Sequence, residues 1–558
     1  TTARTTVVID HTVSRAAASS SSSRLEAPPT NTTTPTGGCS GSPAVSANAA
    51  STADSSWYRR CCTAGRYALW LVTGGGLSVA DDEPGTPAAA SLKGLVRVLA
   101  FEHPDMRTTL VDLDITQDPL TALSAELRNA GSGSRHDDVI AWRGERRFVE
   151  RLSRATIDVS KGHPVVRQGA SYVVTGGLGG LGLVVARWLV DRGAGRVVLG
   201  GRSDPTDEQC NVLAELQTRA EIVVVRGDVA SPGVAEKLIE TARQSGGQLR
   251  GVVHAAAVIE DSLVFSMSRD NLERVWAPKA TGALRMHEAT ADCELDWWLG
   301  FSSAASLLGS PGQAAYACAS AWLDALVGWR RASGLPAAVI NWGPWSEVGV
   351  AQALVGSVLD TISVAEGIEA LDSLLAADRI RTGVARLRAD RALVAFPEIR
   401  SISYFTQVVE ELDSAGDLGD WGGPDALADL DPGEARRAVT ERMCARIAAV
   451  MGYTDQSTVE PAVPLDKPLT ELGLDSLMAV RIRNGARADF GVEPPVALIL
   501  QGASLHDLTA DLMRQLGLND PDPALNNADT IRDRARQRAA ARHGAAMRRR
   551  PKPEVQGG

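Results

Sequence analysis

The sequence has little that would place it in a membrane, outside the cell or on nucleic acid. Its 558 residues contain no apolar run near the roughly 18 residues of a membrane span, and no secretory signal opens the chain. A formal net charge of −10 gives no reason to expect nucleic acid as a partner. We therefore expect a cytoplasmic protein with no membrane span and no nucleic-acid partner.

Cysteines are few and scattered. There are seven, and only Cys61 and Cys62 lie close together, which is not a metal-ligand spacing. An odd number without a framework is typical of reduced thiols in a cytosolic protein. The sequence therefore predicts neither a metal site nor a disulfide scaffold.

Composition divides the chain into segments. The start is rich in Ser, Thr, Ala, Gly and Pro, and it buries too little apolar surface to offset the entropy of ordering. Nine acidic residues and no Lys or Arg lie from Glu410 to Glu434, the composition of an extended linker. The first residue is threonine, so we expect a fragment or missing upstream residues. The expected segments are a low-complexity, flexible start (1–66), a first α/β segment (67–157), a larger α/β domain (158–398), an acidic flexible linker (399–434), a compact helical domain (435–517) and a basic tail (518–558).

Residues 171–345 have the pattern of a doubly wound, Rossmann-type α/β domain. Short β-rich runs alternate with helical patterns, which is typical of right-handed βαβ units in a parallel sheet. The predicted strands are 172–175, 197–200, 222–225, 251–253, 297–301 and 337–341.

Glycines follow the first of these strands. The strand ending at Thr175 runs into Gly177-x-Gly179-x-x-Gly182 and then into a helical pattern. Such glycines allow a tight turn and a close approach of a pyrophosphate to the helix N-terminus. A merely flexible turn is the alternative, but the strand–turn–helix context favours a dinucleotide site.

The ends of the next two strands indicate which dinucleotide is bound. An NAD site would place an acidic residue after the second strand, but here Arg202 and Ser203 follow it, which suits a 2′-phosphate. A solvated strand-end arginine is the alternative for Arg202. Asp228, at the end of the third strand, is expected on the adenine side, and Val229 beside it is included among the cofactor-binding residues. We predict NADPH rather than NADH.

Further motifs in this domain occur in a fixed order. They are Thr175 to Gly182, His254 to Ala257, Phe301 to Ser303, Gly312 to Tyr316 and Asn341 to Gly343. On these motifs the domain resembles the ketoreductases of type I polyketide synthases, a branch of the short-chain dehydrogenase/reductases. The resemblance implies NADPH-dependent reduction of a β-ketoacyl thioester, and it adds His254 and Ala255 to the cofactor-binding residues.

The resemblance also implies a catalytic set. Tyr316 would be the proton donor, and Ser303 would hydrogen-bond the substrate oxygen. A free tyrosine titrates at about 10, so it needs a nearby positive charge, which Lys279 would supply. The family usually has asparagine four residues after the tyrosine, whereas this chain has Ser320, which is shorter and has no amide. We favour a reduced rate over an inactive domain.

One motif bears on stereochemistry. Asp261 matches the second aspartate of the Leu-Asp-Asp marker of B-type ketoreductases, although Ile259 and Glu260 differ from that marker. Leu308 lies eight residues before Tyr316, where A-type domains have tryptophan. The resemblance implies a D-configured β-hydroxyacyl product.

Residues 67–157 resemble the structural, non-catalytic half of such ketoreductases. A strand pattern ends at Gly74, as before a cofactor turn, but Asp81, Asp82 and Glu83 follow. Their carboxylates would repel a pyrophosphate. We expect a truncated fold that braces the catalytic half.

The helical segment carries a second motif. Residues 471–480 resemble the attachment site of acyl carrier domains, which have an all-α, four-helix fold. Ser476 lies where a helix should begin, the end of a helix that favours a phosphodiester. Spacing alone supports only a capping serine. The resemblance implies 4′-phosphopantetheine on Ser476, attached by a phosphopantetheinyl transferase.

The whole chain thus resembles the C-terminal ketoreductase and carrier region of a polyketide synthase, in the style of actinobacterial synthases of envelope lipids. Ketosynthase and acyltransferase domains, and in a fully reducing synthase dehydratase and enoylreductase, are expected upstream or on other chains. Nine Lys/Arg against five Asp/Glu in residues 518–558 fit a frayed extension or a docking segment for an acidic partner. Two other readings stay open: a carrier and scaffold with an inactive reductase, and a stand-alone dehydrogenase, which the carrier motif disfavours.

Overall fold

The structure is a computed structural model of the whole chain. It describes residues 7–15, 68–80, 83–129, 135–155, 157, 165–244, 248–348, 358–387, 392–393, 395–415, 423–427, 430–451, 464–472, 474 and 476–518. Among the helices in these ranges, none combines the length and the apolar character that a bilayer crossing requires.

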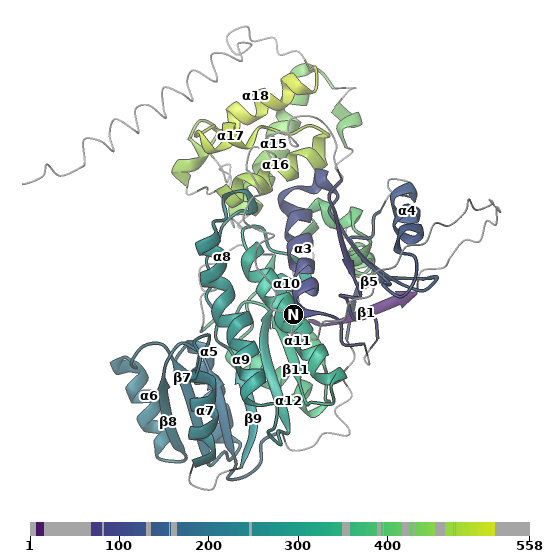
Figure 1. Cartoon of the computed structure of the whole chain (residues 1–558). Coiled ribbons are helices and arrows are strands. Elements are labelled where there is room, and N and C mark those ends of the chain that lie inside the picture. The colour runs from purple at the N-terminus through teal and green to yellow at the C-terminus, as the bar shows by residue number, and fades with distance from the viewer. Residues whose placement is uncertain are drawn as a thin grey trace, which may run out of the picture.

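One sheet of 13 strands runs through both α/β segments (Figure 1). Its order is β2-β3-β4-β5-β1-β13-β11-β10-β9-β6-β7-β8, and β12 pairs with β13 off this path. The strands are β1 (Val7–Arg15), β2 (Trp70–Gly74), β3 (Thr109–Leu113), β4 (Val139–Arg143), β5 (Arg146–Arg154), β6 (Ser171–Thr175), β7 (Arg196–Gly201), β8 (Glu221–Arg226), β9 (Leu249–His254), β10 (Trp297–Ser303), β11 (Ala338–Trp342), β12 (Leu359–Asp360) and β13 (Arg381–Leu387).

The catalytic half is the expected doubly wound domain. Strands β6 to β11 pair in parallel, and each overlaps one of the six predicted strands. Successive residues of β6 pack into different cores, Tyr172 and Val174 into one and Val173 into the other, because side chains alternate across a strand. The helices are α5 (Gly180–Asp191), α6 (Asp207–Gln217), α7 (Val234–Arg243), α8 (Arg269–Trp276), α9 (Gly282–Ala289), α10 (Ala304–Leu308), α11 (Ala314–Ala332) and α12 (Val364–Ala376).

The first α/β segment packs against the catalytic half. Its helices are α2 (Pro87–Ala90), α3 (Leu92–Glu102) and α4 (Pro119–Asn129), followed in the chain by β4 and β5. A side chain at Gly94 of α3 would collide with the backbone of Ala317 in α11, so the two helices lie in close contact. Because α11 carries Tyr316, this segment braces the helix that holds the predicted proton donor.

The N-terminal residues differ from the expectation. Val7–Arg15 form β1, which pairs antiparallel with β5 on one side and β13 on the other. Composition alone does not predict this strand, because the hydrogen bonds that order it come from partners far along the chain. The flexible start predicted for residues 1–66 is therefore wrong for residues 7–15, and residues 16–66 lie outside the described part.

The predicted linker is also partly structured. After η7 (Pro397–Ser401) come η8 (Ser403–Phe405), α14 (Thr406–Ala415) and η9 (Pro424–Leu427). Ile402, Tyr404 and Phe405 are buried in a core with Phe101 of α3. The acidic composition gave a wrong prediction here, because apolar residues precede the acidic run and pack into a core shared by the two α/β segments. The flexible linker predicted for 399–434 is therefore wrong for its first part.

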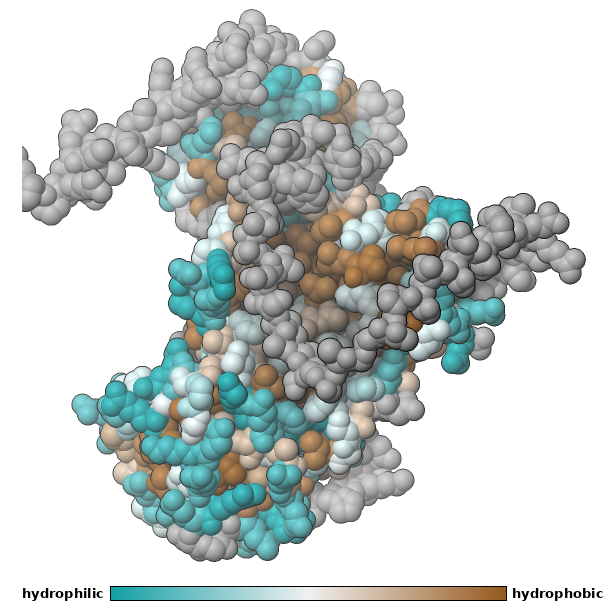
Figure 2. All heavy atoms as spheres, in the orientation of Figure 1, coloured by the Kyte–Doolittle hydropathy of each residue, from teal (hydrophilic) through white to brown (hydrophobic). Residues whose placement is uncertain are grey.

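In its described residues, the helical segment forms four α-helices, as expected. They are α15 (Pro432–Met451), α16 (Ser476–Phe490), α17 (Val496–Leu500) and α18 (Leu505–Gln515), with η10 (Leu469–Leu472) before α16. Phe490 and Leu512 are buried between them, and Arg446 forms a buried ion pair with Asp489. Figure 2 shows hydrophilic residues covering the catalytic half around α6, and hydrophobic ones gathered on the structural half around β5. The basic tail lies outside the described residues.

Candidate functional site

The turn between β6 and α5 is shaped by glycines. Gly176 has φ +65°, a conformation that favours glycine, and a side chain at Gly182 would collide with the carbonyl of Gly176. Gly177 is as restricted, because its Cβ would lie 2.8 Å from the carbonyl oxygen of Val174. Gly179 caps α5 without a side-chain hydrogen bond. The first N–H groups of α5 can therefore bind an anion, which fits a dinucleotide pyrophosphate.

The other predicted cofactor residues follow the neighbouring strands. Arg202 and Ser203 are exposed directly after β7, and Asp228 and Val229 follow β8. The Asp228 carboxylate accepts a hydrogen bond from the N–H of Ala230 at 2.9 Å, which fixes that loop. All of these residues lie at the carboxyl ends of adjacent parallel strands, where such sheets bind ligands. Because β7 is followed directly by Arg202 and Ser203 rather than by a carboxylate, this edge of the sheet suits a ribose 2′-phosphate.

Lys279 and Tyr316 come together as predicted. The Lys279 ammonium lies 3.2 Å from the Tyr316 hydroxyl and 3.1 Å from the carbonyl oxygen of Phe301, to which it donates. Its nitrogen also lies 4.4 Å from the centre of the Tyr316 ring. Both residues are buried, so water screens the ammonium little. A cation in this place stabilises the negative charge left when the phenol loses its proton.

His254 positions the backbone of Lys279. Lys279 lies in a π-helical turn, Ala277–Thr281, and its carbonyl oxygen is 3.0 Å from His254 Nε2. A carbonyl can only accept, so Nε2 carries the proton and Nδ1 accepts from the Thr175 hydroxyl at 2.9 Å. Burial lowers the pKa of His254 to about 4, so the ring is neutral near pH 7. The His254 side chain thus links Thr175, at the end of β6, to Lys279, while Ala255 next to it is partly exposed.

Ser303 ends β10, two residues after the carbonyl of Phe301 that binds Lys279. Its oxygen accepts a hydrogen bond from the N–H of Ala305 at 3.1 Å, so its own proton can be donated elsewhere. Behind it, the amide nitrogen of Asn341 donates to Asp324 and to Ser306, both at 2.9 Å. Asp324 and Ser306 were not predicted, since no local pattern marks them. This buried network fixes the strand end that carries Ser303.

Ser320 is not brought into the hydrogen bonding of the pair. It is fully buried, and its hydroxyl has no hydrogen-bond partner among the described residues. Lys279 instead donates to the carbonyl of Phe301. Direct support of the lysine by Ser320, the role of the usual asparagine, is therefore absent from the described geometry.

Two loops, which carry Asp261 and Gly312 and which we interpret as the entrance for the substrate, are joined by the structural half. Asp261 is exposed, and its carboxylate accepts from the Gln313 amide at 3.0 Å. The carboxylate of Glu102, at the end of α3, accepts from the N–H of Gly312 at 2.8 Å and from that of Val264 at 2.9 Å. Burial raises the pKa of Glu102. Glu102 could not be predicted from the motifs, because it lies in the structural half, far in sequence from the loops that it binds.

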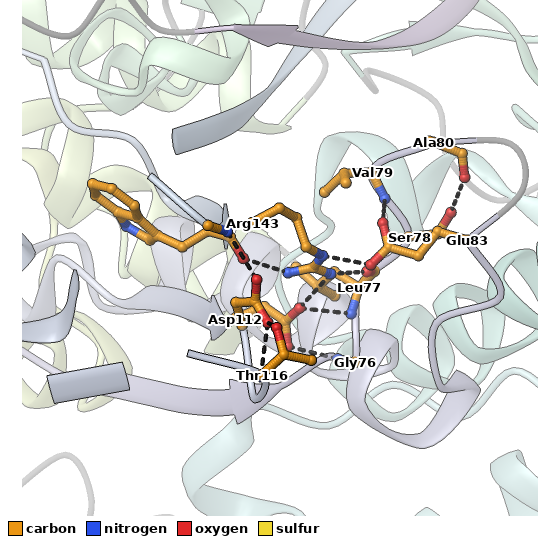
Figure 3. A network of polar contacts seen from close by, with 12 residues as sticks. Gly76, Leu77, Ser78, Val79, Ala80, Glu83, Asp112, Thr116 and Arg143 are labelled. Carbon is orange, nitrogen blue, oxygen red and sulfur yellow. Dashed lines mark hydrogen bonds and ion pairs between the residues drawn. The ribbon is translucent and has the colours of Figure 1, made fainter. Parts of the chain in front are cut away.

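The turn after β2 cannot take a second dinucleotide (Figure 3). The carboxylate of Asp112 accepts from the N–H groups of Gly76 at 2.7 Å and Leu77 at 3.1 Å, so an internal anion fills the place of a phosphate. Arg143 neutralises Asp112 at 2.9 Å and also pairs with Glu83. The sequence predicted that Glu83 would repel a pyrophosphate, and this reason is wrong because Arg143 pairs with its carboxylate. Asp81 and Asp82 lie outside the described residues.

The attachment motif lies as predicted at a helix start. Helix α16 begins at Ser476, directly after the segment that holds Leu474 in the core. Anions are favoured at this end of a helix, where unpaired N–H groups point outwards. The serine therefore has the backbone setting that a phosphodiester needs.

Family comparisons cover three parts of the chain. Residues 170–347 match the KR domain, residues 441–512 match the phosphopantetheine attachment site, and residues 1–152 match the Rossmann fold domain of the polyketide synthase extender module SpnB. The last match includes β1, which agrees with its place in the sheet.

Curated relatives are mycobacterial synthases. The chain is 41% identical over 371 residues to a phenolphthiocerol/phthiocerol polyketide synthase protein of Mycobacterium tuberculosis, covering 66% of this chain and 17% of that protein. It is 38% identical over 375 residues to phthioceranic/hydroxyphthioceranic acid synthase of Mycobacterium bovis, covering 65% and 17%. The chain thus spans about a sixth of the length of these relatives.

Solved structures show the same likeness. An A-type ketoreductase from a modular polyketide synthase has a TM-score of 0.55 and 31% identity, covering 62% of this chain and 74% of that one. The ketoreductase from the first module of phoslactomycin biosynthesis in Streptomyces sp. HK803 has a TM-score of 0.54 and 30% identity, covering 59% and 78%.

Proposed function

Because the chain belongs to the ketoreductases of modular polyketide synthases and carries a phosphopantetheine attachment domain, we propose that it reduces a β-ketoacyl thioester held on its own carrier domain. The contact that carries this proposal is the one between Lys279 and Tyr316, at 3.2 Å, in the domain that bears the glycine turn. When bound at the glycine turn, NADPH would supply the hydride. The product is the β-hydroxyacyl thioester, which stays on the carrier.

The chain's own residues handle the proton and the charge. The Tyr316 hydroxyl gives its proton to the oxygen that becomes the alcohol, and the ammonium of Lys279 stabilises the phenolate left behind. The Ser303 hydroxyl donates a hydrogen bond to the same substrate oxygen and keeps its proton. Rigid support comes from His254 beneath the lysine and from Asn341 behind the serine. Asp261, at the entrance, is assigned to stereocontrol and a D-configured product.

The cofactor residues follow from the strand ends. The first turn of α5, opened by Gly177, Gly179 and Gly182, would hold the pyrophosphate, and Arg202 with Ser203 would hold the 2′-phosphate. The remaining residues assigned to the cofactor site are Asp228, Val229, His254 and Ala255. Ser476 would carry 4′-phosphopantetheine, attached by a phosphopantetheinyl transferase.

The assembly context is part of the proposal. Ketosynthase and acyltransferase domains must supply the β-ketoacyl chain, and the likeness to mycobacterial synthases supports a lipid product made in the cytoplasm. A second candidate function is a carrier and scaffold with an inactive reductase. The partnerless hydroxyl of Ser320 among the described residues is the observation in its favour.

The deciding experiment is NADPH oxidation by the purified chain with a free β-ketoacyl thioester, wild type beside Tyr316→Phe. We expect turnover in the wild type and a loss of at least about 100-fold in the variant, the usual worth of a positioned acid. NADPH binding without turnover in either protein, with a control reductase accepting the substrate, would instead establish the inactive scaffold.

A further inference from the structure

The carrier domain contacts the reductase at one corner, where α3 ends (Figure 1). Arg487 of α16 forms an ion pair with Asp105, which lies in η2 (Pro104–Met106) directly after α3. One turn earlier in α16, Arg483 donates to the carbonyl oxygen of Glu102 at 2.9 Å. Two arginines on one face of α16 thus bind two neighbouring acceptors of the structural half.

The charges on the two sides are complementary. Glu102 is the last residue of α3, so its carbonyl lies at the negative end of the helix dipole, which favours a cation. Glu398, in η7, lies against α16, and the charges of Arg446, Arg483 and Arg487 act on its carboxylate. The carrier side therefore presents two arginines, with the carrier's own Glu493 at 3.9 Å from each, and the reductase side presents the Asp105 carboxylate and a helix C-terminus. Such complementarity sets orientation more than affinity.

The contacted residue also belongs to the active-site entrance. The carbonyl of Glu102 receives Arg483, while its carboxylate holds Gly312 and Val264 of the two entrance loops. Gly312 lies four residues before Tyr316 in the chain. The carrier thus rests on the residue that borders the catalytic centre.

The attachment serine is close to the same corner. Ser476 and Arg483 lie in one helix, seven residues apart, which corresponds to about 10 Å along its axis. A carrier held through Arg483 therefore has its arm tethered near the entrance. Tethering of this kind raises the effective concentration of the thioester.

We propose that the corner formed by Glu102, Asp105 and Glu398 is the docking surface on which the chain's own carrier presents its acyl arm to the reductase, through Arg483 and Arg487. This inference rests on the proposed function, since it names the surface that delivers that function's substrate. Asp105 and Arg487 lie outside the catalytic set. Their ion pair can therefore be altered without touching the chemistry.

The test compares two substrates in the full chain. Asp105→Arg, Arg487→Asp and the double variant are loaded with a β-ketoacyl group on Ser476, and single-turnover NADPH oxidation is followed. Each single reversal places like charges together, so we expect the carrier-bound substrate to react about three- to tenfold more slowly. Reduction of a free β-ketoacyl thioester should be unchanged. The double variant, which reverses both charges, should regain most of the rate.

Controls separate docking from other effects. Arg437→Asp removes an exposed arginine of α15 that pairs locally with Glu441, and it should react like the wild type. Mass spectrometry of each loaded protein shows that Ser476 is equally modified. Unchanged rates in both single variants, or a double variant no faster than either, would overturn the docking surface. Failure of the proposed function looks different, because the wild type would then not reduce the free thioester.

Discussion

At the scale of single residues, Ser320 is the position where the chain departs from the family pattern. Its hydroxyl is buried and makes no hydrogen bond among the described residues. A buried hydroxyl without a partner costs stability, on the order of 1–3 kcal/mol. Lys279 donates its hydrogen bond to the carbonyl of Phe301 instead. The Ser320 hydroxyl thus takes no part in the hydrogen bonding around Lys279 among the described residues.

We expect Ser320→Ala to leave kcat for a free β-ketoacyl thioester within about twofold and to raise the free energy of unfolding by about 1 kcal/mol, since an unpaired polar group is removed. Steady-state kinetics and thermal unfolding of the two proteins test this. A loss of kcat above tenfold with unchanged stability would contradict it and assign Ser320 a direct part in proton transfer.

Residues with a local signal could be predicted, and those without one could not. Tyr316, Ser303 and Lys279 belong to motifs whose spacing survives in a single sequence, and the structure brings Lys279 and Tyr316 into contact. Glu102 acts on loops more than 150 residues further along the chain. Asp112 likewise accepts a hydrogen bond from Gly76, in a turn that lies 36 residues earlier in the sequence. Such partners depend on the folded arrangement alone.

At the scale of elements, α3 connects the structural half to the active site. It packs on α11, and its last residue, Glu102, joins the two entrance loops. The loop that carries Asp261 is held against Gln313 in the same place. The non-catalytic half thus sets the shape of the substrate entrance as well as bracing a helix.

Glu102→Gln should loosen this entrance. An amide places a donor where the carboxylate accepts from a backbone N–H, so one hydrogen bond is lost, worth about 1.4 kcal/mol or tenfold in kcat/KM. We also expect the minor β-hydroxy configuration to rise severalfold, since Asp261 is less well placed. Chiral chromatography of the product measures it. A purely structural role would lower thermal stability with an unchanged product ratio.

Elements with strong apolar runs were predicted, and those ordered by distant partners were not. The six strands of the catalytic half were expected because each is a short apolar run between turn residues. Strand β1 lies in a segment of low-complexity composition, and its hydrogen bonds come from β5 and β13. Helix α14 begins a segment whose acidic character suggested a linker. For both elements, contacts with distant parts of the chain determine the structure.

At the scale of the whole molecule, the stability of the folded chain should depend on pH through Glu398, which lies in η7 against α16. Burial raises the pKa of Glu398 to about 7, from 4.5, against the opposing charges of Arg446, Arg483 and Arg487. Unfolded chains ionise this carboxyl above 4.5, whereas the folded chain keeps it protonated until about 7. Its contribution to stability is therefore fully present below pH 4.5 and is lost as the pH rises towards 7.

Glu398→Gln removes this titration. We expect the variant to gain stability relative to the wild type between pH 4.5 and 7, by at most about 1.4 kcal/mol per pH unit, and to differ by a constant amount above that range. Thermal unfolding of both proteins at matched ionic strength gives the difference. Parallel curves across the whole pH range would show that Glu398 titrates normally.

The position of β1 also has a consequence during synthesis. Roughly 370 residues separate its first residue from β13, the partner on its far side. At about 5–20 residues per second, a ribosome needs on the order of 20–75 seconds to make that stretch. Until then β1 can pair on one side at most, and open strand edges are where nascent chains associate wrongly. We therefore expect the open edge of β1 to be exposed to wrong association until β13 has been made.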